Sequence, residues 1–330
     1  MLNVIIAWFS RAVMFATVML FGSMGEILTE KSGHLNLGIP GIMFIGGFTG
    51  FAATHYYEIA VGAAYNPIVC VIIGLVCSFG AAALAGLLYS FLTISLRANQ
   101  NVTGLTITIF GVGLGKFFGT IVMGKSTVSS AAKAFATFST KIPILSKIPV
   151  VGGLVFSYGF MVYLAIIMAI VINYILKRTR VGLNLRAVGE NPGTADAAGV
   201  NVSKYKYFAS TLGGGIAGLG GLYYVLEYNK GMWATSNSIE ALGWLAVALV
   251  IFSTWNSVHA IWGSILFGLL SWAYAFLPKL GVPIPSTTIS LVQMLPYVVT
   301  LMVLIVTSMR KKKENQPPES LGLPYFREDR

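Results

Sequence analysis

Long hydrophobic runs separated by short polar stretches dominate the chain. The nine runs cover residues 4–24, 35–54, 67–94, 102–123, 152–176, 204–227, 241–256, 258–277 and 288–309. Most of them approach or exceed about 18 residues, the length at which a helix can cross ~30 Å of hydrocarbon. The second run is rich in glycine and contains Pro40, a composition that allows a broken or re-entrant helix where protein surrounds it. The pattern predicts an all-α integral membrane protein with about eight to ten transmembrane helices and no sheet core.

Composition supports this interpretation. Hydrophobic residues make up 56% of the chain and charged residues only 10%, whereas a soluble domain carries roughly 25% charged residues. The formal net charge is +11, yet most basic residues lie between the hydrophobic runs instead of forming one stripe. We therefore expect membrane lipid and no nucleic acid around this chain.

Basic clusters predict which loops face the cytoplasm. They follow the fifth run, at 177–186, and the last run, at 310–313. Short loops rich in Lys and Arg stay on the cytoplasmic side, and an even number of runs separates the two clusters. We expect 178–203 and 310–330 in the cytoplasm and 124–150 outside, in a multi-pass protein of a bacterial plasma membrane.

The same reasoning gives the domain organisation. Residues 1–313 form a single membrane domain, and the loop at 25–34 lies on the cytoplasmic side. The tail at 314–330 contains Pro317-Pro318 and mixed charges, a composition typical of a disordered end.

Small residues recur at helical spacing on two runs. Gly111, Gly115 and Gly119 lie four residues apart, and so do Gly214 and Gly218. Such faces let helix backbones approach closely in a bilayer, so these glycines are candidates for helix packing.

Two motifs resemble nucleotide-binding signatures without their structural context. Gly119 to Ser126 matches the P-loop pattern, and 213–218 matches the dinucleotide fingerprint, but both begin inside hydrophobic runs.

The three histidines lack metal-ligand spacing, so no metal site is expected. No nucleophile motif is present either, and we expect a subunit that performs no covalent chemistry and has no ATPase site of its own.

The stretch from 190 to 199 predicts a short helix on the cytoplasmic side. Asn191 suits the N-cap, Pro192 suits the first helical position and Gly199 suits the position after the last turn. A rigid, capped helix between two membrane spans would project from the membrane domain, and another protein could bind it and exert force on it. Its residues are Glu190, Asn191, Pro192, Gly193, Thr194, Ala195, Asp196, Ala197, Ala198 and Gly199. The small alanines would let it sit close to a partner, with Glu190 and Asp196 pairing with basic groups there.

This stretch resembles the coupling loop of ABC importer permeases. Within them, the chain is similar to the branched-chain amino acid/simple-sugar permease family. The string from Gly25 to Gly41, the segment Leu96–Leu105 and the glycines at 218–221 are similar to its nucleoside branch, whose members work with basic-membrane-protein-type binding proteins. His34 and Pro40 depart from that branch's usual Val and Glu.

The resemblance implies the partners. A cytoplasmic ABC ATPase subunit would bind ATP and Mg²⁺, so this chain would need no cofactor. A second permease subunit, identical or paralogous, would complete the pathway, and an external binding lipoprotein would deliver the solute. The implied solute is a nucleoside, with a simple sugar or riboflavin as alternatives.

Polar residues within membrane spans are candidates for the substrate pathway, because placing a polar group in the bilayer costs free energy and such residues are often functional. They are Asn36, Thr103, Thr106 and Thr108. The alternative for each threonine is a hydrogen bond to its own helix. A secondary transporter is disfavoured because Glu26 and Glu30 are expected to precede a span and Glu227 to follow one, which leaves no carboxylate at mid-membrane.

Overall fold

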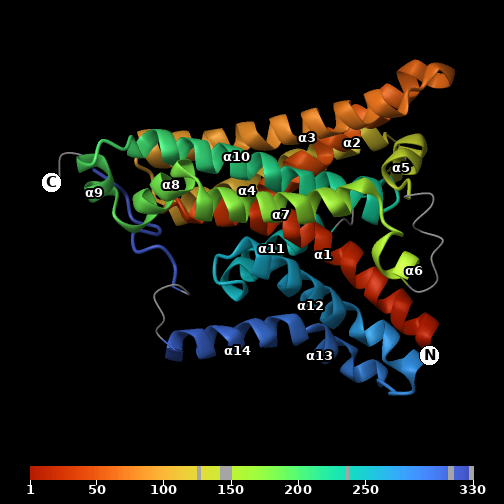
Figure 1. Ribbon diagram of the computed structural model, residues 1–330. Coiled ribbons are helices and arrows are strands. Elements are labelled where there is room, and N and C mark those ends of the chain that lie inside the picture. Colours follow the sequence, from red (N-terminus) through yellow and green to blue (C-terminus); the bar gives the residue numbers. More distant parts are fainter. Residues whose placement is uncertain (125–127, 142–150, 235–237, 311–315, 327–330) are drawn as a thin grey trace.

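The computed structural model describes residues 1–124, 128–141, 151–234, 238–310 and 316–326. Nearly all of them lie in helices (Figure 1). The long helices are α1 (Leu2–Glu30), α2 (Ile39–Val61), α3 (Pro67–Ser90), α4 (Gln100–Met123), α7 (Phe160–Arg178), α10 (Val202–Tyr223), α11 (Ile239–Phe252), α12 (Ser257–Phe276) and α14 (Leu295–Arg310). Each coincides with one of the nine hydrophobic runs.

Short elements connect the long helices. They are η1 (Gly62–Ala64), the π-helix η2 (Phe91–Ser95), α5 (Ala132–Phe138), α6 (Val151–Val155), α8 (Arg180–Glu190), α9 (Pro192–Ala197), the π-helix η4 (Tyr224–Tyr228), η5 (Pro278–Leu280), η6 (Ser286–Thr288) and α13 (Ile289–Gln293). The described strands, β1 (Val128–Ser130) and β2 (Met232–Ala234), pair antiparallel with Ser129 opposite Trp233.

Five helices are both long and apolar enough to cross a membrane: α1, α3 together with η2, α4, α7 and α12. The apolar helices α11 and α14 are shorter, while α2 and α10 have 23 and 22 residues and pack inside the bundle. The protein is therefore an all-α, multi-pass membrane protein, as the hydrophobic pattern predicts.

Asparagine side chains fix where several membrane helices begin. Asn66 caps α3 by accepting from Ile68 N at 2.9 Å, and Asn99 caps α4 by accepting from Val102 N at 3.1 Å. Asn201 and Asn256 do the same for α10 and α12. An N-cap satisfies a backbone N–H that has no partner within the helix, so the chain turns sharply into each span.

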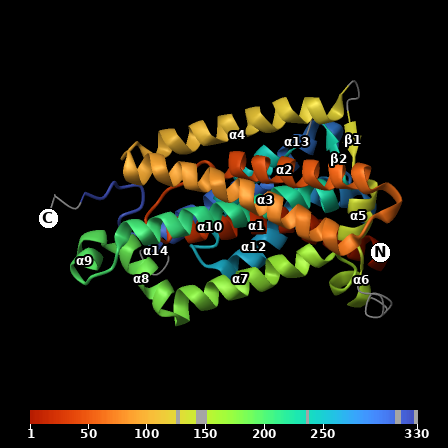
Figure 2. The same cartoon turned by 90° about the horizontal axis from the view of Figure 1, so that it is seen from above.

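Helix α10 is the centre of the bundle and packs against α1, α2 and α3 (Figure 2). The stretch Gly213–Tyr223 is buried throughout. Because glycine has no side chain, the neighbouring backbones come close here: a Cβ added to Gly221 would overlap the carbonyl oxygen of Met43 on α2. Small residues thus let α10 pack in close backbone contact with α1, α2 and α3.

The two ends of the bundle carry different elements. α8, α9 and the last described residues lie at one end, whereas the N-terminus, α5 and α6 lie at the other (Figures 1 and 2). The described parts of 124–150 and the segment 190–199 are therefore at opposite ends. The orientation of the bundle in the membrane stays a prediction.

Helix α1 is longer than the hydrophobic run indicates. The run ends at 24, but the helix continues to Glu30, and the expected loop at 25–34 shrinks to 31–38. Glu26 and Glu30 have 0% and 3% of their surface exposed. The expectation that both lie in a loop before a span is thus wrong: they belong to α1 and lie inside the bundle, where each accepts a hydrogen bond from another segment.

The segment 31–38 enters the bundle without forming a helix, and side chains satisfy its backbone. Gln100 Oε1 accepts from Leu35 N at 2.9 Å, and Tyr89 Oη donates to Leu35 O at 2.6 Å. Glu26 Oε1 accepts from Asn36 N at 3.1 Å. Non-helical backbone at this depth is tolerated because protein encloses it. Pro40 lies in the first turn of α2 and leaves that helix unbroken.

The C-terminal segment differs from the expected disordered tail over residues 316–326. Ser320 N donates to Gly189 O at 3.0 Å, and Gly322 N donates to Gly33 O at 3.2 Å. Ser320 is only 6% exposed. Backbone groups of buried turns bind this segment, a type of contact that composition does not encode.

Candidate functional site

Helices α8 and α9 project from the end of the bundle that also carries the last described residues (Figure 1). α8 begins after Thr179, whose Oγ1 accepts from Gly182 N at 3.1 Å. A Cβ on Gly182 would overlap Ile175 O, so the chain folds tightly back against the end of α7. This turn fixes α8 at a definite angle to the membrane helix.

The caps expected for α9 are present. Asn191 Oδ1 accepts from Thr194 N at 2.9 Å, and Pro192 occupies the first turn. Gly199 has φ +84°, and Val200 N donates to Ala195 O at 3.0 Å, which closes the helix. The helix itself covers Pro192–Ala197, shorter than the expected 190–199.

The residues of α9 divide between an inner and an outer side. Ala195 is 4% exposed and packs with Val188 and Val202, and Asp196 Oδ2 accepts from Tyr325 Oη at 2.8 Å. These two side chains therefore do not face outward, contrary to the expectation for them. Pro192 and Gly193 are half-buried, and the exposed residues are Glu190, Asn191, Thr194, Ala197, Ala198 and Gly199.

Helix α8 rests directly on the segment 31–38. A Cβ on Gly189 would lie 2.3 Å from Lys31 O, so the two backbones touch. Burial lowers the pKa of Lys31, while the charge of Glu190 on α8 opposes that shift.

Three of the four pathway candidates are enclosed. Asn36 is 0% exposed, and its Oδ1 accepts from Gly38 N at 2.9 Å, while Thr108 Oγ1 donates to Leu37 O at 2.8 Å. Thr103 is 7% exposed beside the same segment. The fourth, Thr106, faces outward and donates to Val102 O at 2.8 Å.

The outer face of α4 differs from that of its neighbour α3. The exposed side of α3 is apolar, with Ile68, Val76 and Leu84 all at least 63% exposed. The exposed side of α4 carries Thr106, Gly113, Lys116 and Thr120 beside Ile109 and Phe117.

Lys116 adds an exposed cation to this face. It has no hydrogen bond or ion pair to any residue that the structure describes. A lysine at the centre of a span costs about 2.5–3.5 kcal/mol in lipid. The outer face of α4 therefore combines this cation with apolar side chains, since Leu105, Ile109 and Phe117 are 43%, 75% and 62% exposed.

Four of the five candidate packing glycines lie at close helix contacts, and the fifth, Gly119, lies against Trp233 of β2. Added Cβ atoms would lie 2.4 Å from Gly41 O for Gly111, 2.3 Å from Phe44 Cδ1 for Gly115, 2.4 Å from Trp233 Nε1 for Gly119, 2.9 Å from Ala82 O for Gly214 and 2.2 Å from Ala82 Cβ for Gly218. Gly41 and Phe44 belong to α2, and Ala82 belongs to α3.

The nucleotide-binding look-alikes fall on helices. Gly119 lies within α4 and 213–218 within α10, so neither forms the strand-to-helix turn that binds phosphate. Lys125 lies outside the described residues. Among the residues that are described, no cluster of His, Cys, Asp or Glu could hold a metal ion.

Comparison with known proteins identifies the family. Residues 9–307 match the model of the permease component of the branched-chain amino acid transport system. A guanosine ABC transporter permease of Bacillus subtilis is 31% identical over 96% of this chain and 95% of its own. A nucleoside ABC transporter permease of Lactococcus lactis is 32% identical over 92% of each chain. A putative glucose ABC transporter permease of Haloferax volcanii is 35% identical over 79% of this chain and 74% of its own. No solved structure matches significantly.

The chain belongs to this family of transport permease components. It is a multi-pass protein of the plasma membrane and a transport component of an ABC system, as its sequence motifs indicate.

Proposed function

We propose that this protein is the permease subunit of an ATP-driven importer for nucleosides. The observation that carries the proposal is the match with the guanosine and nucleoside permeases, which extends over 92–96% of this chain. The bundle supplies what such a subunit needs, namely membrane helices, the projecting helices α8 and α9, and an outer face on α4 that carries Lys116. A simple sugar is the second candidate, because the putative glucose permease is 35% identical over 264 residues.

Helices α8 and α9 would dock on a separate ATPase subunit, which binds ATP and Mg²⁺. The exposed side chains there include small or apolar ones, Ala197 and Ala198 on α9 and Leu183, 59% exposed, on α8, beside the polar Glu190, Asn191 and Thr194. Such a surface fits a groove on a partner. The direct contact of Gly189 with Lys31 gives the docked ATPase a mechanical connection to the interior.

The outer face of α4 would border the translocation pathway, opposite a second permease subunit that is identical or paralogous. Lys116 is an exposed cation, and a water-filled passage solvates it at a lower cost in free energy than lipid does. Asn36, Thr103 and Thr108 would shape this wall from behind, by holding the segment 31–38 against α4. An external binding lipoprotein would deliver the solute at the end that carries α5 and α6.

Reconstitution tests the proposal. The protein, with its ATPase and binding-protein partners, is placed in vesicles, and uptake of labelled guanosine is measured with and without ATP. We expect ATP-dependent uptake that excess unlabelled adenosine or uridine reduces and excess glucose does not. Uptake of labelled glucose with no transport of guanosine would establish the sugar alternative instead.

A further inference from the structure

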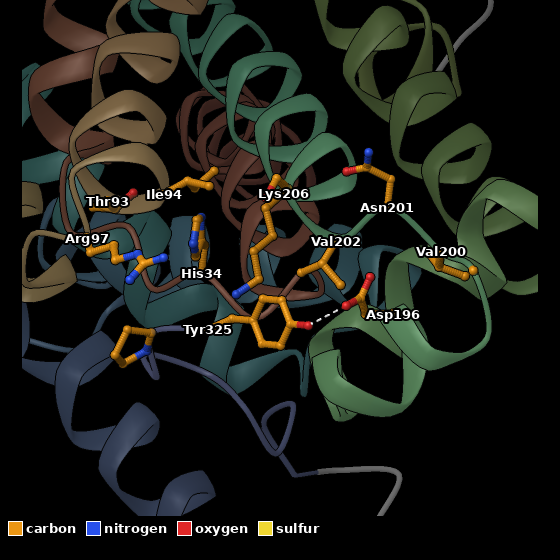
Figure 3. Close-up of a pocket in the computed structure, with 13 residues that line it drawn as sticks. His34, Thr93, Ile94, Arg97, Asp196, Val200, Asn201, Val202, Lys206 and Tyr325 are labelled. Carbon is orange, nitrogen blue, oxygen red and sulfur yellow. Dashed lines mark hydrogen bonds between the residues drawn. The ribbon is translucent and has the colours of Figure 1, made fainter. Parts of the chain in front are cut away.

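A cavity of about 460 Å³ lies at the end of the bundle next to α9. The first turn of α10, the segment at His34, the turn after η2 and the C-terminal segment at Tyr325 form its walls (Figure 3). This volume is in the range of small-molecule sites. The exposed face of α4 does not contribute to the cavity, so it is separate from the proposed substrate pathway.

Lys206 is the chemically unusual residue of this cavity. Its side chain is only 2% exposed, yet it makes no hydrogen bond or ion pair with any described residue. Figure 3 shows its amino group pointing into the space between His34 and Tyr325. The stem of Lys206 is buried while its amino group opens into the cavity, where an anionic ligand can pair with it.

The other walls strengthen the positive character of the cavity. The N-terminal end of α10 lines it at Asn201, Val202 and Ser203, and the end of a helix of 22 residues carries a partial positive charge. His34 is 2% exposed, and burial and the charge of Lys206 hold its pKa well below the usual range, so its imidazole is neutral and adds no charge. Among the described lining residues Asp196 is the only carboxylate, and it accepts a hydrogen bond from Tyr325.

We propose that this cavity binds a phosphate-bearing anion, through the ammonium group of Lys206 and the first turn of α10. A phosphate has several strong acceptor oxygens and can accept from an ammonium group and helix N-terminal amides together. The cavity has room for more than one phosphate, and the ring of Tyr325 offers a flat wall for an attached organic group.

Such a ligand would act on α9 through the C-terminal segment. Tyr325 contacts the cavity and binds Asp196 of α9, so an occupant would hold the segment and α9 together. The regulatory consequence rests on the proposed function, because it assumes that α9 docks on the ATPase. The binding itself does not, and it is measured without transport.

Calorimetry on the full-length protein in nanodiscs of phosphatidylcholine tests the site, with inorganic phosphate and AMP as probes. We expect both to bind and AMP to bind more tightly, and binding should raise the Tm. Lys206→Met should weaken binding about ten- to a hundredfold, because a charge-assisted hydrogen bond is lost. It should also raise the Tm of the ligand-free protein, because an unpaired buried charge is removed.

Lys204→Met is the matched control. Lys204 lies two residues away on α10 but is exposed, so its loss should leave both binding and Tm unchanged. Equal phosphate binding in Lys206→Met and the wild type would overturn the site, and so would equal weakening by Lys204→Met.

A second arm distinguishes the source of the phosphate. Nanodiscs containing phosphatidic acid replace the soluble probes. A Tm increase that depends on this lipid and is lost in Lys206→Met would assign the cavity to a lipid headgroup. Absence of any response to phosphate, AMP and phosphatidic acid at millimolar concentration would overturn the proposal, and would leave an acidic side chain of the ATPase as the remaining partner for Lys206.

Discussion

The side chain of Glu26 accepts a hydrogen bond from the backbone N–H of Asn36, with 3.1 Å between Oε1 and N. One turn further along α1, Glu30 accepts from the indole N–H of Trp255, in the turn between α11 and α12. Two carboxylates of α1 thus bind two non-helical segments of the protein, namely 31–38 and the turn that contains Trp255. Both are enclosed, so breaking either contact leaves a backbone or indole donor without a partner.

Glu26→Ala should lower the free energy of unfolding by about 1–3 kcal/mol, because the buried N–H of Asn36 loses its acceptor. Glu26→Gln keeps an oxygen at the same place and should remain close to the wild type. Thermal denaturation of the two variants in the same detergent compares them. Equal Tm values for the alanine and glutamine variants would show that the hydrogen bond contributes nothing.

Gly111→Ala should impair assembly or lower stability, because the new Cβ would lie 2.4 Å from Gly41 O and no backbone atom can move aside cheaply. Gly115→Leu should act in the same direction through Phe44. Gly113→Ala is the control on the same helix, since nothing lies within 4 Å of its Cβ. Size-exclusion profiles report assembly, and a Gly113→Ala variant as damaged as Gly111→Ala would point to helix propensity instead of packing.

The sequence predicts the helices better than the interruptions between them. Hydrophobic length locates all nine long helices, and the Asn191-Pro192 and Gly199 caps locate α9. The end of α1 was placed six residues early, because Glu26 and Glu30 look like loop residues until their partners from 31–38 and 255 are known.

Side-chain direction was equally inaccessible from the sequence. Thr103, Thr106 and Thr108 have the same chemistry and lie on one helix, yet Thr103 and Thr108 are enclosed, the latter with a hydrogen bond to Leu37 O, whereas Thr106 faces outward. The inward position of Asp196 depends on Tyr325, which is 129 residues away in the chain. Long-range contacts of this kind leave no trace in local periodicity.

Cysteine labelling tests the orientation of the bundle. In a background with Cys70 and Cys77 replaced by alanine, Lys133→Cys and Glu190→Cys place thiols on exposed residues at opposite ends. A membrane-impermeant maleimide should label position 133 in intact cells, and position 190 only after the membrane is opened. Labelling of both positions from outside would refute the assignment of 178–203 to the cytoplasm.

Thr106→Trp should block transport while the complex still assembles, because its side chain points out of α4 toward the proposed pathway. Val76→Trp is the control, since Val76 is 63% exposed on the apolar face of α3 and a tryptophan there would meet lipid. Uptake into vesicles is compared after equal incorporation is verified. Normal uptake by Thr106→Trp would place the pathway elsewhere.

Ala198→Trp should uncouple ATP hydrolysis from uptake. Ala198 is exposed at the end of α9, where bulk would prevent close seating on the ATPase, and it makes no contribution to the buried cluster of Val188, Ala195 and Val202. The helix should therefore keep its fold, because Asn191 and Gly199 still cap it. The expected result is an assembled complex whose ATPase activity no longer responds to substrate and whose uptake falls at least about tenfold, a loss of ~1.4 kcal/mol in coupling.

Two further variants separate coupling from folding. Leu84→Trp places a tryptophan at a residue that is 66% exposed on the apolar face of α3, away from both proposed docking ends, and should leave both activities unchanged. Ala195→Trp adds the same bulk to the buried side of α9 and should lower the Tm, because that alanine is 4% exposed. ATPase activity and uptake are measured side by side in the same vesicles. If Ala198→Trp keeps substrate-stimulated hydrolysis and uptake at wild-type rates, α9 does not contact the ATPase, and the exposed apolar side chains of α8, with Leu183 foremost, become the surface to test.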